Sequence, residues 1–163
     1  MDKKIKLGIS SCLLGENVRY DAGHKLDHFL RDTLGKFVEW VGVCPEVECG
    51  LGVPREEMYL THSPESPRLI TKITNIDHTD KMLKWVEKRL KELKKKKISG
   101  FIFKSNSPSC GLYKVFHNKG AGIFAVELTK YFHGLPVEDE ERLRKKSVRK
   151  KFIEDISAYL PCA

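Results

Sequence analysis

Residues 5–12 read IKLGISSC, and residues 37–44 read FVEWVGVC. Each stretch is a short, mainly apolar run that ends at a cysteine. Runs of this kind, rich in Ile, Leu and Val, are typical of buried β-strands, so we expect strands over 5–10 and 37–43. Pro45 ends the second run, because proline cannot continue a central β-ladder. The pattern therefore places Cys12 and Cys44 just beyond the carboxyl ends of two strands.

The rest of the chain continues this alternation of strands and helices. Apolar residues at three-to-four spacing make 78–96 the clearest helix. The other predicted elements are a helix over 26–34 closed by Gly35, a long loop over 46–67 with one helical turn, strands over 68–73 and 98–103, an extended piece over 113–116, helices over 121–132, 138–144 and 147–160, and an extended segment starting at Val137. This order predicts an α/β fold with a mostly parallel sheet and flanking helices.

Length and composition set the class of protein. A chain of 163 residues is long enough for one substantial core, so we expect a single domain over residues 1–163. No apolar run is long enough to span a membrane, and the N-terminus lacks the pattern of a signal peptide, which predicts a cytoplasmic protein.

The formal charge is +8. Because the basic runs 94–97 and 142–151 lie in helical patterns, we interpret them as solvated helix faces rather than a nucleic-acid surface.

Three of the five cysteines follow predicted strands. Cys110 lies in the loop after the strand over 98–103, as Cys12 and Cys44 follow the two strands before it. In an open parallel sheet, the loops after the strands open onto one edge, where ligands bind. An odd number of cysteines without a secretion signal favours metal or catalytic roles over disulfides. The fold therefore predicts that these three thiols share one site.

Three thiolates indicate an iron–sulfur cluster more than zinc. A structural zinc site uses four ligands, often as close pairs, and no C-x-x-C occurs in the chain. Clusters are bound by cysteine thiolates, normally four. Three thiolates on a [4Fe-4S] cluster would leave one iron open to water or substrate, and an open iron can act as a Lewis acid. The alternative is that Cys12, Cys44 and Cys110 are ordinary buried core residues.

The two remaining cysteines are weaker candidates. Cys49 lies five residues after Cys44, and this C-x4-C spacing is found in some cluster proteins. It is a possible fourth ligand, although its loop could equally direct it elsewhere. Cys162 stands next to the end of the sequence, after Pro161, and we expect it to take no part.

Polar residues accompany the three thiols. Glu46 is two residues from Cys44 and could act as a general base on water beside an open iron; Glu48 is the competing carboxylate. In the turn-rich loop 107–111, the hydroxyls of Ser107 and Ser109 and the backbone N–H groups could bind cluster sulfurs or a substrate.

Cations also lie in the same three loops. Arg19, Arg55 and Lys104 could bind an anionic substrate such as a nucleotide phosphate. The alternative is that they are surface charges or form salt bridges within the loops.

At these residues the sequence resembles a known family. The motifs are SSCLLG at 10–15 with VRYD at 18–21, CPEV at 44–47 with GL at 50–51 and VPR at 53–55, and KSNSPSCG at 104–111. They resemble, in order, the signatures of a former domain-of-unknown-function family that includes the thiouracil desulfidases. The resemblance spans roughly Ile5 to Ile156.

The resemblance implies a Rossmann-like α/β domain with a [4Fe-4S] cluster. Carried over motif by motif, the cluster ligands are Cys12, Cys44 and Cys110. It also implies that Glu46 and Ser107 assist in binding and catalysis. The family more often has a small residue where this chain has Cys49.

Residues and resemblance together favour a desulfidase acting on a small thiolated pyrimidine such as thiouracil or a thiouridine nucleotide. The soft thiocarbonyl sulfur would bind the open iron, Glu46 would activate water or relay protons, and Ser107 would orient the substrate or donate a proton. Oxygen would replace the sulfur, which leaves as hydrogen sulfide without net electron transfer. A base, a nucleoside and a nucleotide are all candidate substrates, and we expect neither a membrane nor a nucleic acid as partner.

Two other functions fit parts of the sequence. A non-catalytic iron–sulfur or zinc-binding module, acting in redox sensing or nucleic-acid binding, would need a fourth ligand, so Cys49 would be essential and Glu46 dispensable. A metal-free hydrolase with a cysteine nucleophile needs a histidine beside the thiol, and His24 or His117 would have to supply it.

Overall fold

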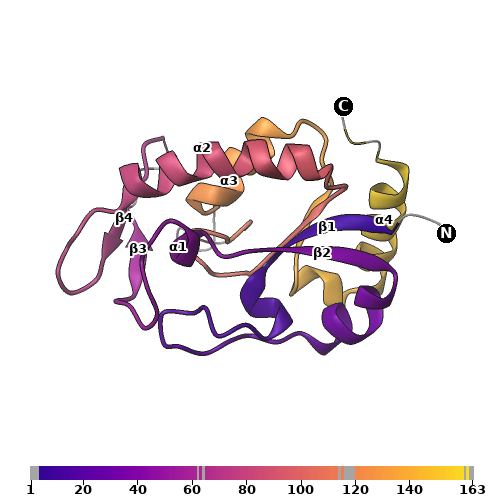
Figure 1. The fold of residues 1–163 in the computed structure, drawn as a ribbon, viewed down its shortest axis with the longest axis horizontal. Helices are drawn as coiled ribbons and strands as arrows, with labels where there is room; N and C mark the ends of the chain where they lie inside the picture. Colours follow the sequence, from indigo (N-terminus) through magenta and orange to yellow (C-terminus); the bar gives the residue numbers. More distant parts are fainter. Residues whose placement is uncertain are drawn as a thin grey trace.

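A four-stranded parallel sheet with the order β2-β1-β5-β6 forms the centre of the fold (Figure 1). The computed structural model describes residues 4–61, 63, 65–113, 115, 120–159 and 161. The strands of this sheet are β1 (Ile5–Ser10), β2 (Val38–Val43), β5 (Phe101–Phe103) and β6 (Val137–Asp139). This architecture confirms the predicted α/β fold with a mostly parallel sheet.

The pairing of the first two strands brings the first two cysteines to one edge. β1 and β2 pair over their whole lengths, from Ile5 opposite Val38 to Ser10 opposite Val43. Both strands therefore end at the same level, and the segments that carry Cys12 and Cys44 leave the sheet side by side.

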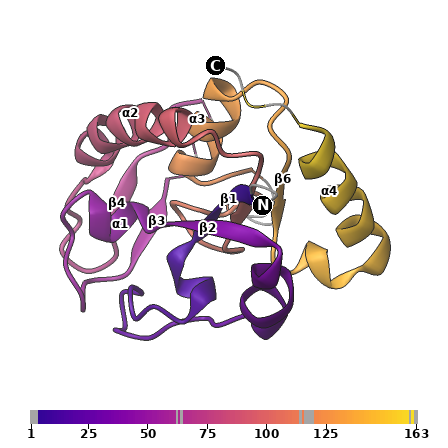
Figure 2. The ribbon, with the colours of Figure 1, turned by 45° about the vertical axis from the view of Figure 1, so that its right-hand side comes forward.

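Helices cover both faces of the sheet (Figures 1 and 2). One face packs on α2 (Thr79–Lys96) and α3 (Ile123–Tyr131), through a core that includes Phe101, Phe103 and Phe124. The other face packs on α4 (Lys146–Ala158) and on short helical turns. These turns are η1 (Ser11–Leu14), η2 (Phe29–Thr33), η3 (Leu34–Lys36) and η4 (Arg142–Arg144).

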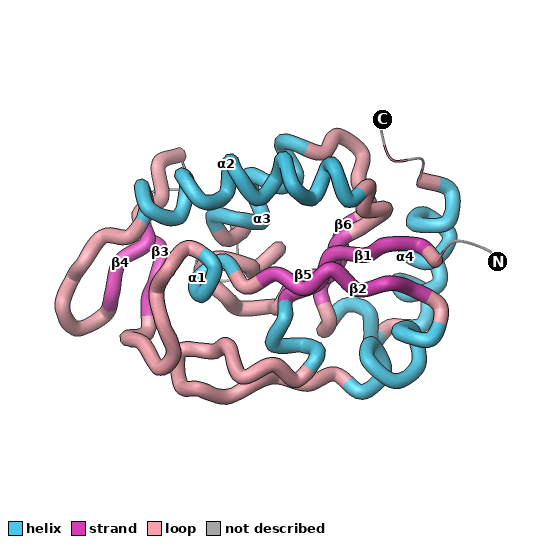
Figure 3. The backbone as a smooth tube through the Cα atoms, viewed as in Figure 1, coloured by secondary structure: helices cyan, strands magenta, loops and turns pink. Residues whose placement is uncertain are grey.

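A second, two-stranded sheet lies beside the first turn of α2 (Figure 3). It pairs β3 (Met58–Leu60) with β4 (Leu69–Thr71) in antiparallel register. Met58, Leu60 and Leu69 join the core under α2. The single helical turn predicted in the long loop is α1 (Pro45–Glu48), directly after β2, but the sequence did not predict β3 within that loop.

Some predicted elements were wrong where tertiary pairing overrides local pattern. The helix predicted over 138–144 begins instead as strand β6, because its backbone pairs with β5, and only Arg142–Arg144 form a 3₁₀ turn. The helix over 26–34 is replaced by the η2 and η3 turns, and Gly35 lies inside η3 rather than ending a helix.

Other predictions fall partly outside the described structure. In the extended piece predicted over 113–116, Tyr113 lies in a bend and Val115 in a turn. Lys114 and Phe116 are outside the described residues, as are His117, Leu160 and Cys162. Within the described part of the chain, no helix has the length and apolar character needed to cross a bilayer.

Candidate active site at the carboxyl edge of the sheet

A cavity of about 180 Å³ opens at the carboxyl edge of the sheet. Its walls come from the segments that follow β1, β2 and β5, together with residues before and within β3. The three cysteines assigned to the cluster and six of the polar candidates line it: Cys12, Arg19, Cys44, Glu46, Arg55, Lys104, Ser107, Ser109 and Cys110. The structure thus brings together three motifs that are far apart in the sequence.

The three thiols lie near one another in the wall of this cavity. Cys12 and Cys110 are buried and Cys44 is partly buried. Burial raises the pKa of Cys12 to about 11 and raises the pKa of Cys44 and Cys110 as well. The charges of the other two cysteines raise the pKa of Cys110 further. These thiols are protonated at neutral pH, so binding a metal group there requires them to release protons.

The first and third cysteine loops are tied to each other and to the core. The Ser10 hydroxyl at the end of β1 accepts the backbone N–H of Lys104 at 2.9 Å. The first residues of α3 hold the Cys110 loop: Phe124 N–H donates to Ser109 O at 3.0 Å. A Cβ on Gly122 would lie 2.6 Å from that same Ser109 carbonyl, so only glycine permits this close approach.

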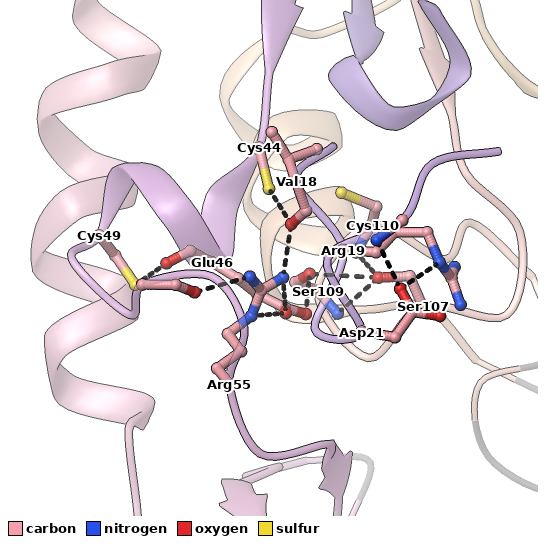
Figure 4. A network of polar contacts seen from close by, with 12 residues as sticks. Val18, Arg19, Asp21, Cys44, Glu46, Cys49, Arg55, Ser107, Ser109 and Cys110 are labelled. Atoms are coloured by element: carbon pink, nitrogen blue, oxygen red, sulfur yellow. Dashed lines mark hydrogen bonds and ion pairs between the residues drawn. The ribbon is translucent and has the colours of Figure 1, made fainter. Parts of the chain in front are cut away.

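Glu46 is held from two sides (Figure 4). Its Oε2 forms an ion pair with the Arg55 guanidinium: it accepts a hydrogen bond from Nε at 2.7 Å, and Nη2 lies 2.6 Å away. Its Oε1 accepts the Ser109 hydroxyl at 3.0 Å. Because Glu46 lies in the first turn of α1 after Pro45, its backbone is constrained too. The carboxylate is therefore buried, bonded through both oxygens and part of the cavity wall.

Ser107 extends this network toward the third cysteine. Its Oγ lies 3.2 Å from Ser109 Oγ and accepts the Cys110 N–H at 3.1 Å. The single Ser109 hydroxyl proton is already donated to Glu46, so Ser107 must be the donor between the two serines. The three side chains form a continuous hydrogen-bonded row from Ser107 through Ser109 to Glu46.

The three predicted cations differ in how they are paired. Arg55 is engaged by Glu46, and Lys104 Nζ forms an ion pair with Glu140 while also donating to Ser105 Oγ at 2.9 Å. Arg19 makes a longer ion pair, 3.4 Å from its Nε to Asp21 Oδ1. Arg19 is thus the cation of the three with the weakest protein partner. Whether any of them binds substrate stays a prediction.

Glu140 is a residue that the sequence did not single out. It follows β6, and its carboxylate accepts the Ser105 N–H at 2.8 Å and the Ser105 hydroxyl at 2.7 Å. This contact fixes the loop after β5 across the edge of the sheet. No local signal could have found it, since Glu140 stands within the acidic run 138–141 that the sequence predicted to be helical.

Two residues that competed for roles at the site lie elsewhere. Cys49 is buried at the end of α1, donates its S–H to Glu46 O at 3.3 Å and is not part of the cavity wall. Glu48 also lies outside the wall and pairs with Arg89 of α2, at 3.3 Å from Nε to Oε2. Figure 4 shows Cys49 apart from Cys44 and Cys110, with its sulfur directed at the Glu46 carbonyl.

No histidine is among the residues found to line the cavity in the described part of the chain. His24 is exposed, and its Nδ1 accepts the backbone N–H of Leu26; His117 lies outside the described residues.

Among the described residues, no three His, Cys, Asp or Glu side chains converge closely enough to hold one metal ion. A cluster spreads its thiolate ligands over several irons, which suits thiols that share a cavity wall without converging on a point.

The fold and the site define an α/β protein with a thiol-lined, carboxylate-bearing cavity at the edge of a parallel sheet. The profile of the 2-thiouracil desulfurase family matches residues 7–140. The chain belongs to the 2-thiouracil desulfurase family, in agreement with the resemblance of its motifs.

Two other proteins are similar to this chain. The chain is 29% identical over 119 residues to the uncharacterized protein YbbK of Bacillus subtilis (strain 168), covering 70% of this chain and 78% of that protein. A solved structure of the [4Fe-4S]-dependent thiouracil desulfidase TudS is similar to the fold, with a TM-score of 0.71 and 29% sequence identity. That similarity covers 91% of this chain and 99% of TudS.

Proposed function

We propose that this protein is a [4Fe-4S]-dependent desulfidase that replaces the sulfur of a thiolated pyrimidine, such as thiouracil or a thiouridine nucleotide, by oxygen. The observation that carries the proposal is that Cys12, Cys44 and Cys110 line one cavity wall. The Glu46 carboxylate lies in the same wall and is hydrogen-bonded through both of its oxygens. Membership of the 2-thiouracil desulfurase family and similarity to TudS support it.

The residues present fit a cluster with three protein ligands. Cys12, Cys44 and Cys110 supply soft thiolate ligands from three different loops, and Cys49 is not part of the same wall. Once their protons are released, the three thiolates would hold three of the four irons. When bound, such a cluster supplies a Lewis acid with an open coordination site for a soft sulfur.

The proposed reaction needs a base close to the reacting carbon. The Glu46 carboxylate can take a proton from water as the water oxygen adds to the carbon that carries sulfur. The carbon–sulfur bond then breaks, the carbon keeps the oxygen, and the sulfur leaves as hydrogen sulfide with the two protons of water. Oxidation states balance without an added electron donor or acceptor.

Ser107 and Ser109 serve this proton movement. Because Ser107 donates to Ser109 and Ser109 donates to Glu46, the row can return a proton from the carboxylate to the cavity by rotation of two hydroxyl groups. Ser107, the outer member of the row, can alternatively turn its hydroxyl to orient the substrate. Arg19 is positioned in the wall to contact the ring substituents or an anionic group.

The proposal extends to the setting of the enzyme. Residues 1–163 would act as one iron–sulfur domain on a small cytoplasmic substrate. No nucleic acid is needed for the proposed reaction.

Anaerobic reconstitution with iron and sulfide tests the function. We expect a brown protein that binds close to four irons per chain, removes the ultraviolet absorbance of 2-thiouracil and releases hydrogen sulfide. The Cys110→Ser variant should lose both the visible absorbance and the activity. Full activity of Cys110→Ser, or of colourless protein, would contradict the proposal.

A further inference from the structure

Arg55 uses every nitrogen of its guanidinium group within the protein. Nε and Nη2 bond Glu46 Oε2, Nη1 donates to Gly52 O at 3.0 Å, and Nη2 also donates to Val18 O at 2.9 Å. The side chain is only 10% exposed. A guanidinium that is engaged in this way has little donor capacity left for a substrate anion.

We propose that Arg55 is a positioning residue that acts on the reaction through Glu46 and does not bind the substrate. This inference rests on the proposed function, in which Glu46 is the base. Arg55 holds one carboxylate oxygen and Ser109 holds the other. With both oxygens bonded, the carboxylate plane has one orientation relative to the cavity.

The same side chain connects the base to the segment that faces a proposed cluster ligand. Val18 O accepts one hydrogen bond from Arg55 Nη2 and another from the Cys44 thiol, whose Sγ lies 3.7 Å away. A thiolate that binds iron has no proton to donate. Arg55 would then be the remaining donor to this carbonyl, so the loop that carries Val18 keeps its anchor whether Cys44 is free or metal-bound.

Arg55 therefore links three segments at one point: the loop after η1 through Val18, the α1 turn through Glu46, and its own loop through Gly52. A lysine in its place keeps the charge but has one nitrogen, which cannot reach three acceptors in the same geometry. A displacement of a catalytic group by about 1 Å can cost about 10²-fold in rate. The loss should appear for every substrate, whatever its charge.

The test compares an uncharged and an anionic substrate in reconstituted Arg55→Lys and Arg55→Gln proteins. We expect kcat to fall by about 10²-fold for both 2-thiouracil and 2-thiouridine 5′-monophosphate. KM for each should stay within about twofold of its wild-type value, and the iron content should not change. The matched control is Arg89→Lys, which alters the ion pair of Glu48 outside the cavity and should leave kcat unchanged.

Two outcomes would overturn the inference. One is a rise in KM confined to the nucleotide, with kcat for 2-thiouracil unchanged, which would assign Arg55 to the phosphate. The other is loss of iron from Arg55→Lys, which would make it a support of the cluster instead.

A second measurement separates this inference from the proposed function. The thermal unfolding midpoints of Arg55→Gln, Glu46→Gln and the double variant form a mutant cycle. We expect the double variant to lose less than the sum of the two single shifts, because the two side chains share one contact. Additive shifts would refute the contact between Arg55 and Glu46, whether or not the protein has desulfidase activity. If the shifts are non-additive but the wild-type protein is inactive, the contact stands and only the proposed reaction is refuted.

Discussion

Glu46 and Glu48 lie two residues apart on the same short helix, α1, and each pairs with an arginine, yet their surroundings differ. The Glu46–Arg55 pair has an N–O distance of 2.6 Å, with side chains 12% and 10% exposed. The Glu48–Arg89 pair is longer, at 3.3 Å, with side chains 31% and 14% exposed. Residues two positions apart on a helix face different sides, so one pair borders the cavity and the other joins α1 to α2.

An ion pair by itself does not mark a functional site. Both glutamates have the charge and the position in the sequence to serve as a base next to Cys44. What distinguishes Glu46 is the second bond to Ser109 and its place in the cavity wall. Arg89 instead bonds Gly42 O at 3.2 Å and Glu92 at 2.8 Å, so it anchors α2 to the end of β2.

Replacing each glutamate by glutamine should give the largest contrast. Glu46→Gln removes the proposed base and should lower kcat by about 10²- to 10⁴-fold, whereas Glu48→Gln should change kcat by less than about twofold because its carboxylate does not border the cavity. Steady-state release of hydrogen sulfide from 2-thiouracil measures both. Equal losses in the two variants would erase the distinction that we draw between the pairs.

Ser109→Ala removes the hydrogen bond that Glu46 has and Glu48 lacks. The Glu46 carboxylate would lose one charge-assisted hydrogen bond, of a kind that contributes about 1.5–3 kcal/mol. We therefore expect kcat to fall by about 10- to 100-fold, with the iron content unchanged. Wild-type kcat in Ser109→Ala would show that the Ser107–Ser109–Glu46 row carries no proton.

Arg89→Met should lower stability but leave activity unchanged. It removes a side chain that is bonded to Gly42 O and Glu92 and paired with Glu48. Because these oxygen atoms lose their hydrogen-bond donor, the free energy of unfolding should fall by about 1–3 kcal/mol. Urea denaturation measures this change. The kcat of the reconstituted variant should match that of the wild type, and a large fall in kcat would place Arg89 in the catalytic apparatus.

Cys49→Ser should have the smallest effect. Serine can still donate to Glu46 O, as the Cys49 thiol does, and Cys49 is outside the cavity wall. We expect unchanged iron content and kcat, and a loss of stability of about 1 kcal/mol, because the serine hydroxyl keeps its acceptor and is not left buried without a hydrogen-bond partner. Loss of iron from this variant would instead make Cys49 a fourth ligand and support the non-catalytic module.

The sequence predicted the strand ends, and the place of the three thiols beside them, better than it predicted the partners of the side chains around them. Short apolar runs before Cys12, Cys44 and Cys110 were enough to place three thiols at one edge of a parallel sheet, because strand direction follows from an alternating α/β order. Strand β6 could not be predicted in the same way. Its three residues are too few to show a period, and their strand conformation comes from pairing with β5.

Apolar periodicity and proline act over a few neighbouring residues, so local sequence is enough to place the cysteines and their polar neighbours at the ends of strands. Three features depend instead on how the elements pack: Glu46 faces the cavity and Glu48 does not, Arg55 bonds Glu46, and Glu140 holds the Lys104 loop. These contacts join segments separated by 9 to 36 positions. Their partners are chosen by the packing of whole elements, which no local pattern encodes.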